Sequence, residues 1–525
     1  MGGRTRVSGL SVLMVALLTG CAAMKSHDEL AGKVQSAQRA GGPAAALKEL
    51  EASATSDEAR AALLYNLERG ELLRQDRRYQ DSTAAWLQAD AKVAEWENTA
   101  KTDPSKLLGN VGAALISERL KPYEGQDYEK VWLTTRLALN RIALSDWDSA
   151  RVDIKRTHER EAVIAEFRAK DLAAAEEEAK SKGAQTSFKT LDGYPVESLN
   201  DPDVLKLKNG YQNALSHYLA GFLYEVLNEP GLAAPGYRKA AELQPDTPLL
   251  EEGLAGLDKR TSFTHRRKQR MTDVLFVIES GEAPARKPKG FTVPVPIAGR
   301  INTVSVSYPV IEAARQPGPA ELGVGEAALK PATVVDMNLM ARRALADEMP
   351  GTVLRGVTRA LAKGVMQNEA QKRGGVLLGA LAAVAAVATE QADDRMWRTL
   401  PGVVSVARGY LPEGEHRLLV DGRDSGATVK VSGQYALVPV SVQGAAVSVG
   451  QVASFGQLPP AQAVPVPAAA AVPVSATPKD ARGTRSQARP APKAAAKPAP
   501  AAQPAPAPAA TPAAPAAQRS GPSPD

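Results

Sequence analysis

Apolar residues recur with a helical period on both sides of a short polar break in the stretch from residue 123 to residue 160. Leu137 and Leu144 precede the break at Ser145-Asp146, and Val152 and Ile154 follow it. Apolar positions at helical spacing lie on one face of a helix, so each side of the break predicts an amphipathic helix. The stretch therefore predicts a helix–turn–helix unit.

Small residues stand where the two helices of this unit would touch. Ala138 lies twelve residues before Ala150, and Trp147 stands between them. Small side chains let two antiparallel helices approach, and an aromatic ring can wedge the turn. In these features the stretch resembles a tetratricopeptide (TPR) repeat. Because such a unit cannot bury its apolar face alone, we expect other units to stack on it.

Two further stretches carry the same small, apolar and aromatic positions. Tyr79 and Trp147 occupy the same place in their copies and lie 68 residues apart, which is twice the TPR period of about 34. A copy expected between them, around residues 106–118, fits poorly, so we expect an interrupted array over residues 56–258. The positions assigned to the pattern are Gly70, Tyr79, Trp86, Ala138, Trp147, Ala150, Gly221, Tyr224, Ala233, Tyr237, Ala240 and Pro245.

From residue 271 the period changes to that of strands, with turn residues between the apolar runs. A small antiparallel sheet is expected in an α+β domain over residues 273–450, with helical spacing over residues 354–365. The predicted strands cover residues 274–278, 291–296, 301–308, 333–335, 403–407, 417–420, 427–431 and 435–442.

The run from Gly374 to Thr389 consists almost wholly of apolar and small residues. It is shorter than the ~20 residues that a membrane-spanning helix needs. Gly375, Gly379 and Ala383 form a small-xxx-small face that would pack closely on another helix. We interpret the run as a buried helix, with membrane contact as the alternative.

The segment between the two predicted domains, residues 259–272, is rich in Lys and Arg. Charge clusters are usually exposed, so we interpret it as a solvated basic linker. Contact with lipid head groups or glycan-linked anions is the alternative.

The N-terminus predicts a secretory leader over residues 1–20. Arg4 and Arg6 precede an apolar run from Leu10 to Leu18, and the only cysteine of the chain, Cys21, follows Gly20. Residues 18–21 resemble the bacterial lipobox, in which the cysteine receives a lipid. We therefore predict lipidation of Cys21, which anchors residues 21–55, a spacer and a first helix. By the sorting rule for such lipoproteins, Ala22 favours the outer membrane, with the chain facing the periplasm.

Residues 457–525 consist mainly of alanine and proline with scattered basic residues. This composition cannot bury enough apolar surface to offset ordering, so it predicts a disordered tail. The segment from Lys479 to the end has a net charge of +5, and the leader contributes two arginines, so the remaining body is close to −1. We expect the tail to contact peptidoglycan or another anionic polymer, and the neutral body argues against nucleic-acid binding.

Motifs for catalysis or metal binding are missing from the sequence. The five histidines have no metal-ligand spacing, and we expect no cofactor and no metal. Glu390, Asp393 and Asp394 form the one carboxylate cluster that suggests an acid and a base, although a solvated loop explains it equally well.

Four aromatic residues near the central hairpin allow two interpretations. They could line a ligand groove, but aromatic residues in such a position more often fill the core between helices. These residues are Tyr123, Tyr128, Trp132 and Trp147.

Several longer motifs together resemble a family of largely uncharacterised Gram-negative TPR-containing outer-membrane lipoproteins. They are PYEGQDYEKV from residue 122, PGYRKAAELQP from residue 235, DVLFVIESGEAP from residue 273 and TEQADDRMWRTLP from residue 389. The resemblance covers residues 59–442. It implies work in the cell envelope, since members are often encoded near small lipoproteins that activate peptidoglycan synthases.

From these observations we expect a non-enzymatic, lipid-anchored periplasmic scaffold that binds an unidentified envelope protein through TPR-like repeats. Two other classes of function stay open. One is a cell-wall-active enzyme that uses carboxylates near residues 390–394, and the other is an outer-membrane assembly or export component.

Overall fold

The computed structural model describes residues 26–104, 107, 121–181, 201–297, 300–352, 355 and 392–460. The chain divides into two units, Met1–Ala461 and Gln462–Asp525, and the described residues belong to the first. Several predictions lie outside the described residues. They concern Cys21, Glu390, the Gly374–Thr389 run, the 354–365 helical pattern, nearly all of the poor repeat copy and the tail beyond residue 460.

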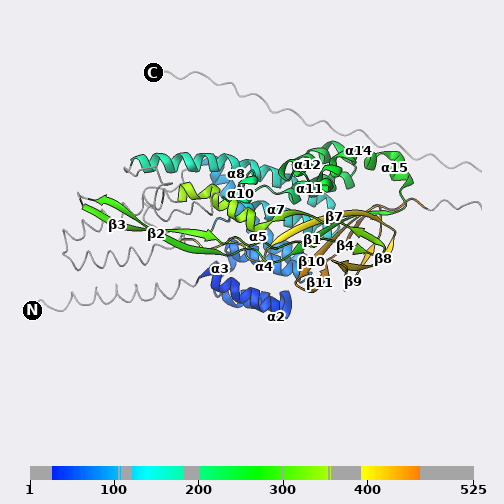
Figure 1. The fold of residues 1–525 in the computed structure, drawn as a ribbon, viewed down its shortest axis with the longest axis horizontal. Helices are drawn as coiled ribbons and strands as arrows, with labels where there is room; N and C mark the ends of the chain where they lie inside the picture. Colours follow the sequence, from blue (N-terminus) through cyan, green and yellow to red (C-terminus); the bar gives the residue numbers. More distant parts are fainter. Residues whose placement is uncertain are drawn as a thin grey trace, which may run out of the picture. The chain divides into compact units, whose positions relative to one another are not determined.

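Helices dominate the described chain before residue 270 (Figure 1). A further helix begins at residue 337 and is described through residue 352. The helices are α2 (His27–Ser53), α3 (Asp57–Ala61), α4 (Leu63–Gln75), α5 (Tyr79–Thr102), α7 (Asp127–Ala143), α8 (Trp147–Ser181), α10 (Pro202–Lys206), α11 (Ala214–Val226), α12 (Pro230–Leu243), α13 (Pro248–Ala255), α14 (Leu257–Thr261) and α15 (Phe263–Lys268).

Three helical hairpins, α4–α5, α7–α8 and α11–α12, turn in the same way. Each turn contains one residue with a left-handed backbone, at Arg77, Ser145 and Asn228, with φ of 61°, 61° and 62°. The amide of the next residue bonds the carbonyl oxygen five residues back, at 2.9, 2.8 and 2.8 Å. This Schellman arrangement ends the first helix of each hairpin and aims the second one back along it.

Close contact between the two helices of a hairpin depends on a small residue in the first helix. A Cβ atom built on Gly70 would lie 2.3 Å from Nε1 of Trp86, and one on Gly221 would lie 2.6 Å from Cδ1 of Tyr237. Ala138 holds the corresponding position in α7 and is fully buried. In each hairpin this small residue stands seven residues before the left-handed turn residue. The three hairpins are therefore built on one pattern.

One residue of the predicted apolar face is misplaced. Val152 is 58% exposed, whereas Leu137 and Ile154 are fully buried. Because Val152 lies only two residues before Ile154, it points away from the face that Ile154 presents to α7.

The strands form three sheets. The largest has the order β11-β10-β1-β7-β6, with β12 also paired to β10; β2 pairs with β3; and the third sheet has the order β5-β4-β8-β9. The strands are β1 (Thr272–Ser280), β2 (Arg286–Ile297), β3 (Arg300–Ile311), β4 (Leu322–Val324), β5 (Ala327–Leu329), β6 (Ala332–Asp336), β7 (Val403–Leu411), β8 (Gly414–Val420), β9 (Arg423–Val431), β10 (Tyr435–Gln443), β11 (Ala446–Val449) and β12 (Ala453–Phe455).

The structure confirms a mixture of helices and sheets and corrects the expectation of purely antiparallel strands. β1 and β10 pair in parallel over eight residues, from Asp273 opposite Tyr435 to Ser280 opposite Val442. Parallel neighbours need a long connection, and here more than 150 residues separate the two strands. A sequence pattern alone does not show such a pairing.

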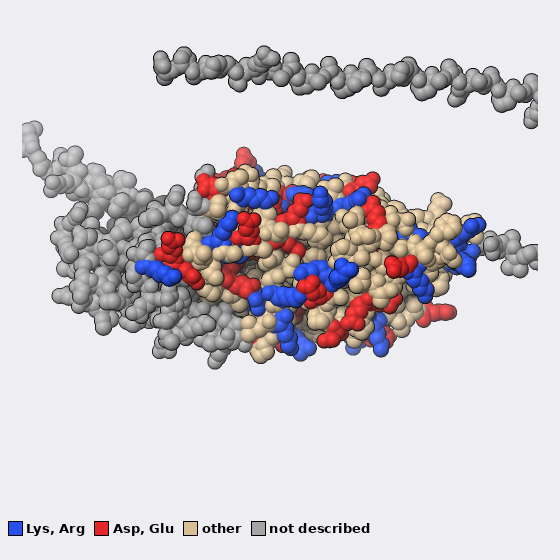
Figure 2. All heavy atoms as spheres, turned by 90° about the horizontal axis from the view of Figure 1, so that it is seen from above, with Lys and Arg blue, Asp and Glu red and all other residues tan. Residues whose placement is uncertain are grey.

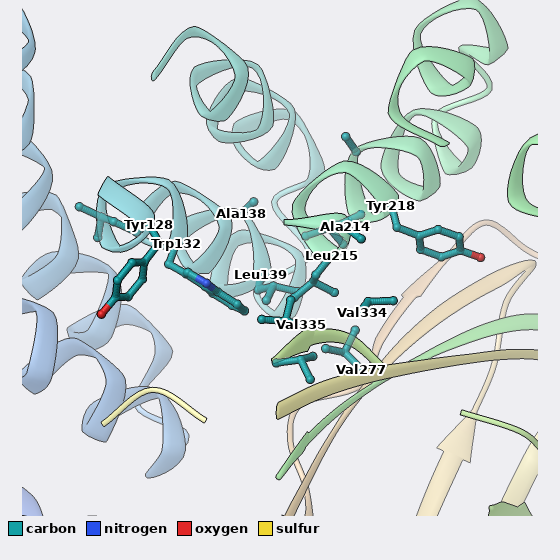
Figure 3. Close-up of a cluster of buried hydrophobic side chains, with 14 of the residues drawn as sticks. Tyr128, Trp132, Ala138, Leu139, Ala214, Leu215, Tyr218, Val277, Val334 and Val335 are labelled. Carbon is teal, nitrogen blue, oxygen red and sulfur yellow. The ribbon is translucent and has the colours of Figure 1, made fainter. Parts of the chain in front are cut away.

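The central strand β1 is buried on both faces, which explains its continuous apolar run. Val274, Phe276 and Ile278 face the core that the largest sheet shares with the β5-β4-β8-β9 sheet. Val277, on the opposite face, belongs to the core that also contains Leu215 of α11 (Figure 3). The helices, the largest sheet and the β5-β4-β8-β9 sheet therefore form three successive layers.

The helices and the large sheet share one apolar core, so the segment predicted as a linker does not separate two cores. Residues 259–272 include the end of α14, all of α15 and the first residue of β1. Arg260 is buried, and its Nε lies 2.8 Å from a carboxylate oxygen of Glu225. The interpretation as a solvated linker is therefore wrong for this arginine, because a carboxylate inside the fold neutralises it.

Candidate partner-binding site

The carboxylates singled out in the sequence have structural partners. Asp394 accepts hydrogen bonds from the hydroxyl of Ser26, at 2.7 Å, and from the amide of His27, at 3.1 Å, at the start of α2. Asp393 forms an ion pair with Arg395 at 2.7 Å. A carboxylate at a helix N-terminus is stabilised by the free amides and by the helix dipole. Both aspartates thus fix the path of the chain around residue 394.

The segment that follows, residues 396–400, is held by two buried glutamates. Glu68 accepts the amides of Arg398 and Thr399 at 2.7 and 2.9 Å, and Glu129 accepts the amide of Trp397 at 2.6 Å. Burial raises the pKa of Glu68 and of Glu129 to about 7, although these hydrogen bonds favour the charged form. Sequence reasoning missed both residues, since an isolated helical glutamate usually lies on the surface.

A ring of charges connects the first two hairpins to β1. Arg136, fully buried in α7, pairs with Glu71 of α4 at 3.1 Å and with Glu279 of β1. Arg74 of α4 closes the ring, at 2.6 Å from Glu71 and 2.5 Å from Glu279. Burial opposes ionisation of Glu279, but the two arginines outweigh it and lower its pKa to about 2. These charges are neutralised within the fold.

The aromatic residues near the central hairpin pack in or against the core between the helices. This is the interpretation that we preferred from the sequence over a ligand groove. Tyr128, Trp132 and Trp147 are buried, and Tyr123 is half-buried and donates its hydroxyl hydrogen to Glu129 at 2.5 Å. Figure 3 shows Tyr128 and Trp132 projecting from α7 among the buried apolar side chains. Tyr123, by contrast, lines an open pocket together with Glu124 and Arg395.

Two pairs of the twelve assigned repeat positions meet inside the hairpins, Gly70 with Trp86 and Gly221 with Tyr237. Tyr79 and Trp147 begin α5 and α8, and Pro245 follows α12 and is exposed. The hydroxyl of Tyr237 donates to Glu225 at 2.6 Å. The remaining positions are buried: Gly70, Trp86, Ala138, Ala150, Gly221, Tyr224, Ala233 and Ala240.

The first helices of the second and third hairpins, α7 and α11, face the large sheet rather than solvent. Every residue of α11 is buried, as is all of α7 except Arg141. Leu139 of α7 and Leu215 of α11 lie in one core with Val277, Val334 and Val335 of the sheet (Figure 3). Stacked repeats commonly bind partners on such a helical face. In this protein its own strands cover that face of α7 and α11.

An open groove lies where two strands, β9 and β11, come close to each other without pairing. Among the described residues β9 pairs only with β8, and β11 pairs only with β10. The groove between them has a volume of about 600 Å³. Thr428 and Lys430 of β9 line one side, and Val447, Ser448 and Val449 of β11 line the other. We call it the edge groove.

The backbone of β11 directs hydrogen-bonding groups into the edge groove. Gly444 has a φ of 60° in the two-residue turn between β10 and β11, which makes Gln443 and Ala446 a hydrogen-bonded pair. Antiparallel pairs alternate between bonded and non-bonded, so Val447 points its N–H and C=O away from β10. The next outward carbonyl, that of Val449, accepts a hydrogen bond from Arg77 at 2.7 Å.

A second hollow adjoins the edge groove on the helix side of β11. This cleft, of about 770 Å³, lies between α2 and the β10–β11 hairpin, and it shares Arg77, Ser448, Val449 and Gly450 with the edge groove. Amide side chains are frequent in its lining, namely those of Gln35, Gln38, Gln75, Gln316 and Gln443. Most of these amides already bond within the fold: Gln38 donates to Gln75 at 2.6 Å, and Gln316 donates to the backbone oxygen of Glu282 at 2.8 Å.

No candidate metal site occurs in the part of the chain that the structure describes. Within the same ranges, no helix is long and apolar enough to cross a membrane. Comparisons of the chain with protein-family models, with curated proteins and with solved structures find no match.

Proposed function

We propose that this protein is a non-enzymatic, lipid-anchored adaptor of the cell envelope that holds an extended segment of a partner protein in the edge groove. The observation that carries the proposal is the open groove along β9 and β11, two strands that lie close together without pairing with each other. An added strand gains affinity from main-chain hydrogen bonds, and neighbouring side-chain pockets give it specificity. Anchoring through Cys21 in the outer membrane, TPR-like hairpins and membership of the lipoprotein family that the sequence resembles belong to the same proposal.

From the sequence we expected the partner to bind the surface of the repeats. We now propose that it binds at the edge of the sheet. The faces of α7 and α11 pack on Val277 and its neighbours, whereas the groove beside β11 is open to solvent. The hairpins then act as a rigid support that positions the two sheets. A cell-wall-active enzyme is less well supported, because Asp393 and Asp394 are engaged in an ion pair and a helix cap.

Photo-crosslinking in intact cells tests the location of the site. A photoreactive amino acid at Ser448 or Thr428, both exposed in the edge groove, is expected to capture one envelope protein. The same amino acid at Lys155, an exposed position on α8, serves as the control and is expected to capture none or a different set. Identical products from the groove and from Lys155, or none from the groove, would contradict the proposal.

A backbone substitution tests strand addition itself. Val447→Pro removes the N–H that points into the groove without removing a hydrogen bond to β10, so we expect loss of the crosslink at Thr428. Val447→Thr keeps both the branched shape and the N–H, and we expect it to retain the crosslink. Thermal melting of both variants shows whether the fold persists. A crosslink that survives in a folded Val447→Pro variant rules out pairing at this edge.

A further inference from the structure

Phe263 is the most exposed large apolar side chain of the described residues, with 77% of its surface accessible. It begins the short helix α15, in which no residue is buried. Its ring has the guanidinium carbon of Arg267 at 6.0 Å from the ring centre. A single exposed apolar residue is ordinary on a protein surface. The charges around Phe263 distinguish this one.

Three exposed cations follow Phe263 without acidic partners. Among the described residues, Arg267, Lys268 and Arg270 form no ion pair with a carboxylate; Arg270 donates to the backbone oxygens of Arg267 and Gln269, at 3.3 and 2.9 Å. The sequence from Lys259 to Arg270 contains no Asp or Glu. Figure 2 shows a group of Lys and Arg side chains at the end of the body where Figure 1 places α15. We call Phe263, Arg267, Lys268 and Arg270 the α15 patch.

Two other residues of the same segment point inward and hold it in place. Arg266 donates to the backbone oxygen of Glu225 at 2.5 Å, and its guanidinium carbon lies 5.3 Å from the ring centre of Tyr435. Gln269 is buried and donates to the backbone oxygen of Gln434 at 2.8 Å. Arg266 and Gln269 thus point toward the body of the protein and are fixed there, whereas the side chains of the α15 patch point to solvent.

We propose that the α15 patch binds the surface of a membrane that contains anionic phospholipids. An aromatic ring that enters the interface between headgroups and acyl chains, surrounded by Lys and Arg, is the usual chemistry of peripheral membrane contact. The cations match the phosphate groups of anionic lipids, and their field acts within about 10 Å at moderate salt. The inference rests on the patch alone and requires neither lipidation of Cys21 nor a partner in the edge groove.

The test uses the chain from residue 21 onward, which retains every described residue, with Cys21→Ser so that it carries no lipid. Thr264→Cys then provides a single thiol next to Phe263 for an environment-sensitive fluorophore. Vesicles containing phosphatidylglycerol are expected to shift the emission to the blue, and phosphatidylcholine vesicles are not. Raising the salt should weaken this binding, because the attraction is screened.

Two variants and two controls make the outcome specific. Arg267→Gln, Lys268→Gln and Arg270→Gln together should weaken vesicle binding about 100-fold, and Phe263→Ser roughly tenfold. The fluorophore on Lys155→Cys of α8 should not shift, and replacing the tail residues from Lys479 to Lys497 that carry positive charge by Gln should leave the shift at residue 264 in place. No shift with anionic vesicles, an equal shift with phosphatidylcholine, or a shift that depends on protein concentration without vesicles overturns the proposal.

Discussion

Substitution of Gly221 tests the contact on which the third hairpin is built. The Cβ atom of an alanine at this position would lie 2.6 Å from Cδ1 and 2.7 Å from Cγ of Tyr237. Carbon atoms pack at about 3.5–4.0 Å, so the ring or the helix must move by about 1 Å. Tyr237 is fully buried, and its hydroxyl group bonds Glu225 at 2.6 Å and Arg408 at 3.0 Å. The ring therefore cannot move without breaking these bonds.

The expected cost follows from two opposing effects. Replacing glycine by alanine inside a helix favours folding by about 1 kcal/mol. Overpacking a tight core costs about 1–3 kcal/mol, and weakening the hydrogen bonds of the Tyr237 hydroxyl adds about 1 kcal/mol or more. We therefore expect Gly221→Ala to lower the free energy of unfolding by about 1–3 kcal/mol, and Gly221→Leu to lower it further.

Urea denaturation followed by circular dichroism at the helical signal measures this change. Gly231 is the matched control, since it lies in α12 and a Cβ atom there would meet no atom within 4 Å. Gly231→Ala should leave the stability unchanged or raise it slightly. If Gly221→Ala is as stable as the starting protein, or more stable, the close contact between α11 and α12 is not as described and the reasoning fails.

Four other predictions concern charge, lipid and the tail. Glu68 has a pKa of about 7 in the fold against 4.5 for an ordinary glutamate, so its contribution to stability is complete below pH 4.5 and is lost as the pH rises through 7. The free energy of unfolding should therefore fall between pH 5 and pH 8, and Glu68→Gln should make this fall smaller by about 3 kcal/mol. An unchanged pH profile in the variant would contradict this. Arg136→Met leaves Glu71 and Glu279 with Arg74 alone and should cost about 3–5 kcal/mol in the same denaturation assay, whereas a neutral effect would show that the ring is dispensable. Cys21→Ala should abolish metabolic labelling with a fatty-acid analogue, and label that persists on the variant refutes lipidation at this residue. The isolated tail should bind cell-wall sacculi at low salt and lose binding when the six Lys and Arg from Lys479 to Lys497 become Gln, while binding that resists this change leaves only a spacer.

Local sequence signals were sufficient to predict most of the helices and strands. Apolar spacing, small residues at Gly70, Ala138 and Gly221, and polar breaks between them predicted the three hairpins, because a close helix contact constrains residue size directly. The alternation around Val293 and the run at Val274 predicted strands for the same reason: side chains on a strand alternate between two faces, or are apolar throughout when both faces are covered.

Elements with weak local patterns were not predicted. The strands β4, β5, β11 and β12 have only three or four residues, too few for a period to appear. The edge groove was missed because β11 was not predicted. An unpaired edge can be recognised only when the positions of all neighbouring strands are known. No feature of the sequence around Val447 indicates such an edge.

The sequence by itself determined the character of each segment: an apolar N-terminal run followed by the only cysteine, paired amphipathic helices, apolar strands and an alanine- and proline-rich tail. Only the tertiary structure decided which of these segments meet. It placed β1 beside β10 across more than 150 residues, covered one face of α7 and α11 with the large sheet, and drew Arg136, Glu71 and Glu279 together from three elements. Long-range pairing and buried charge depend on the geometry of packing between distant segments, whereas periodicity records only which face of each segment is apolar.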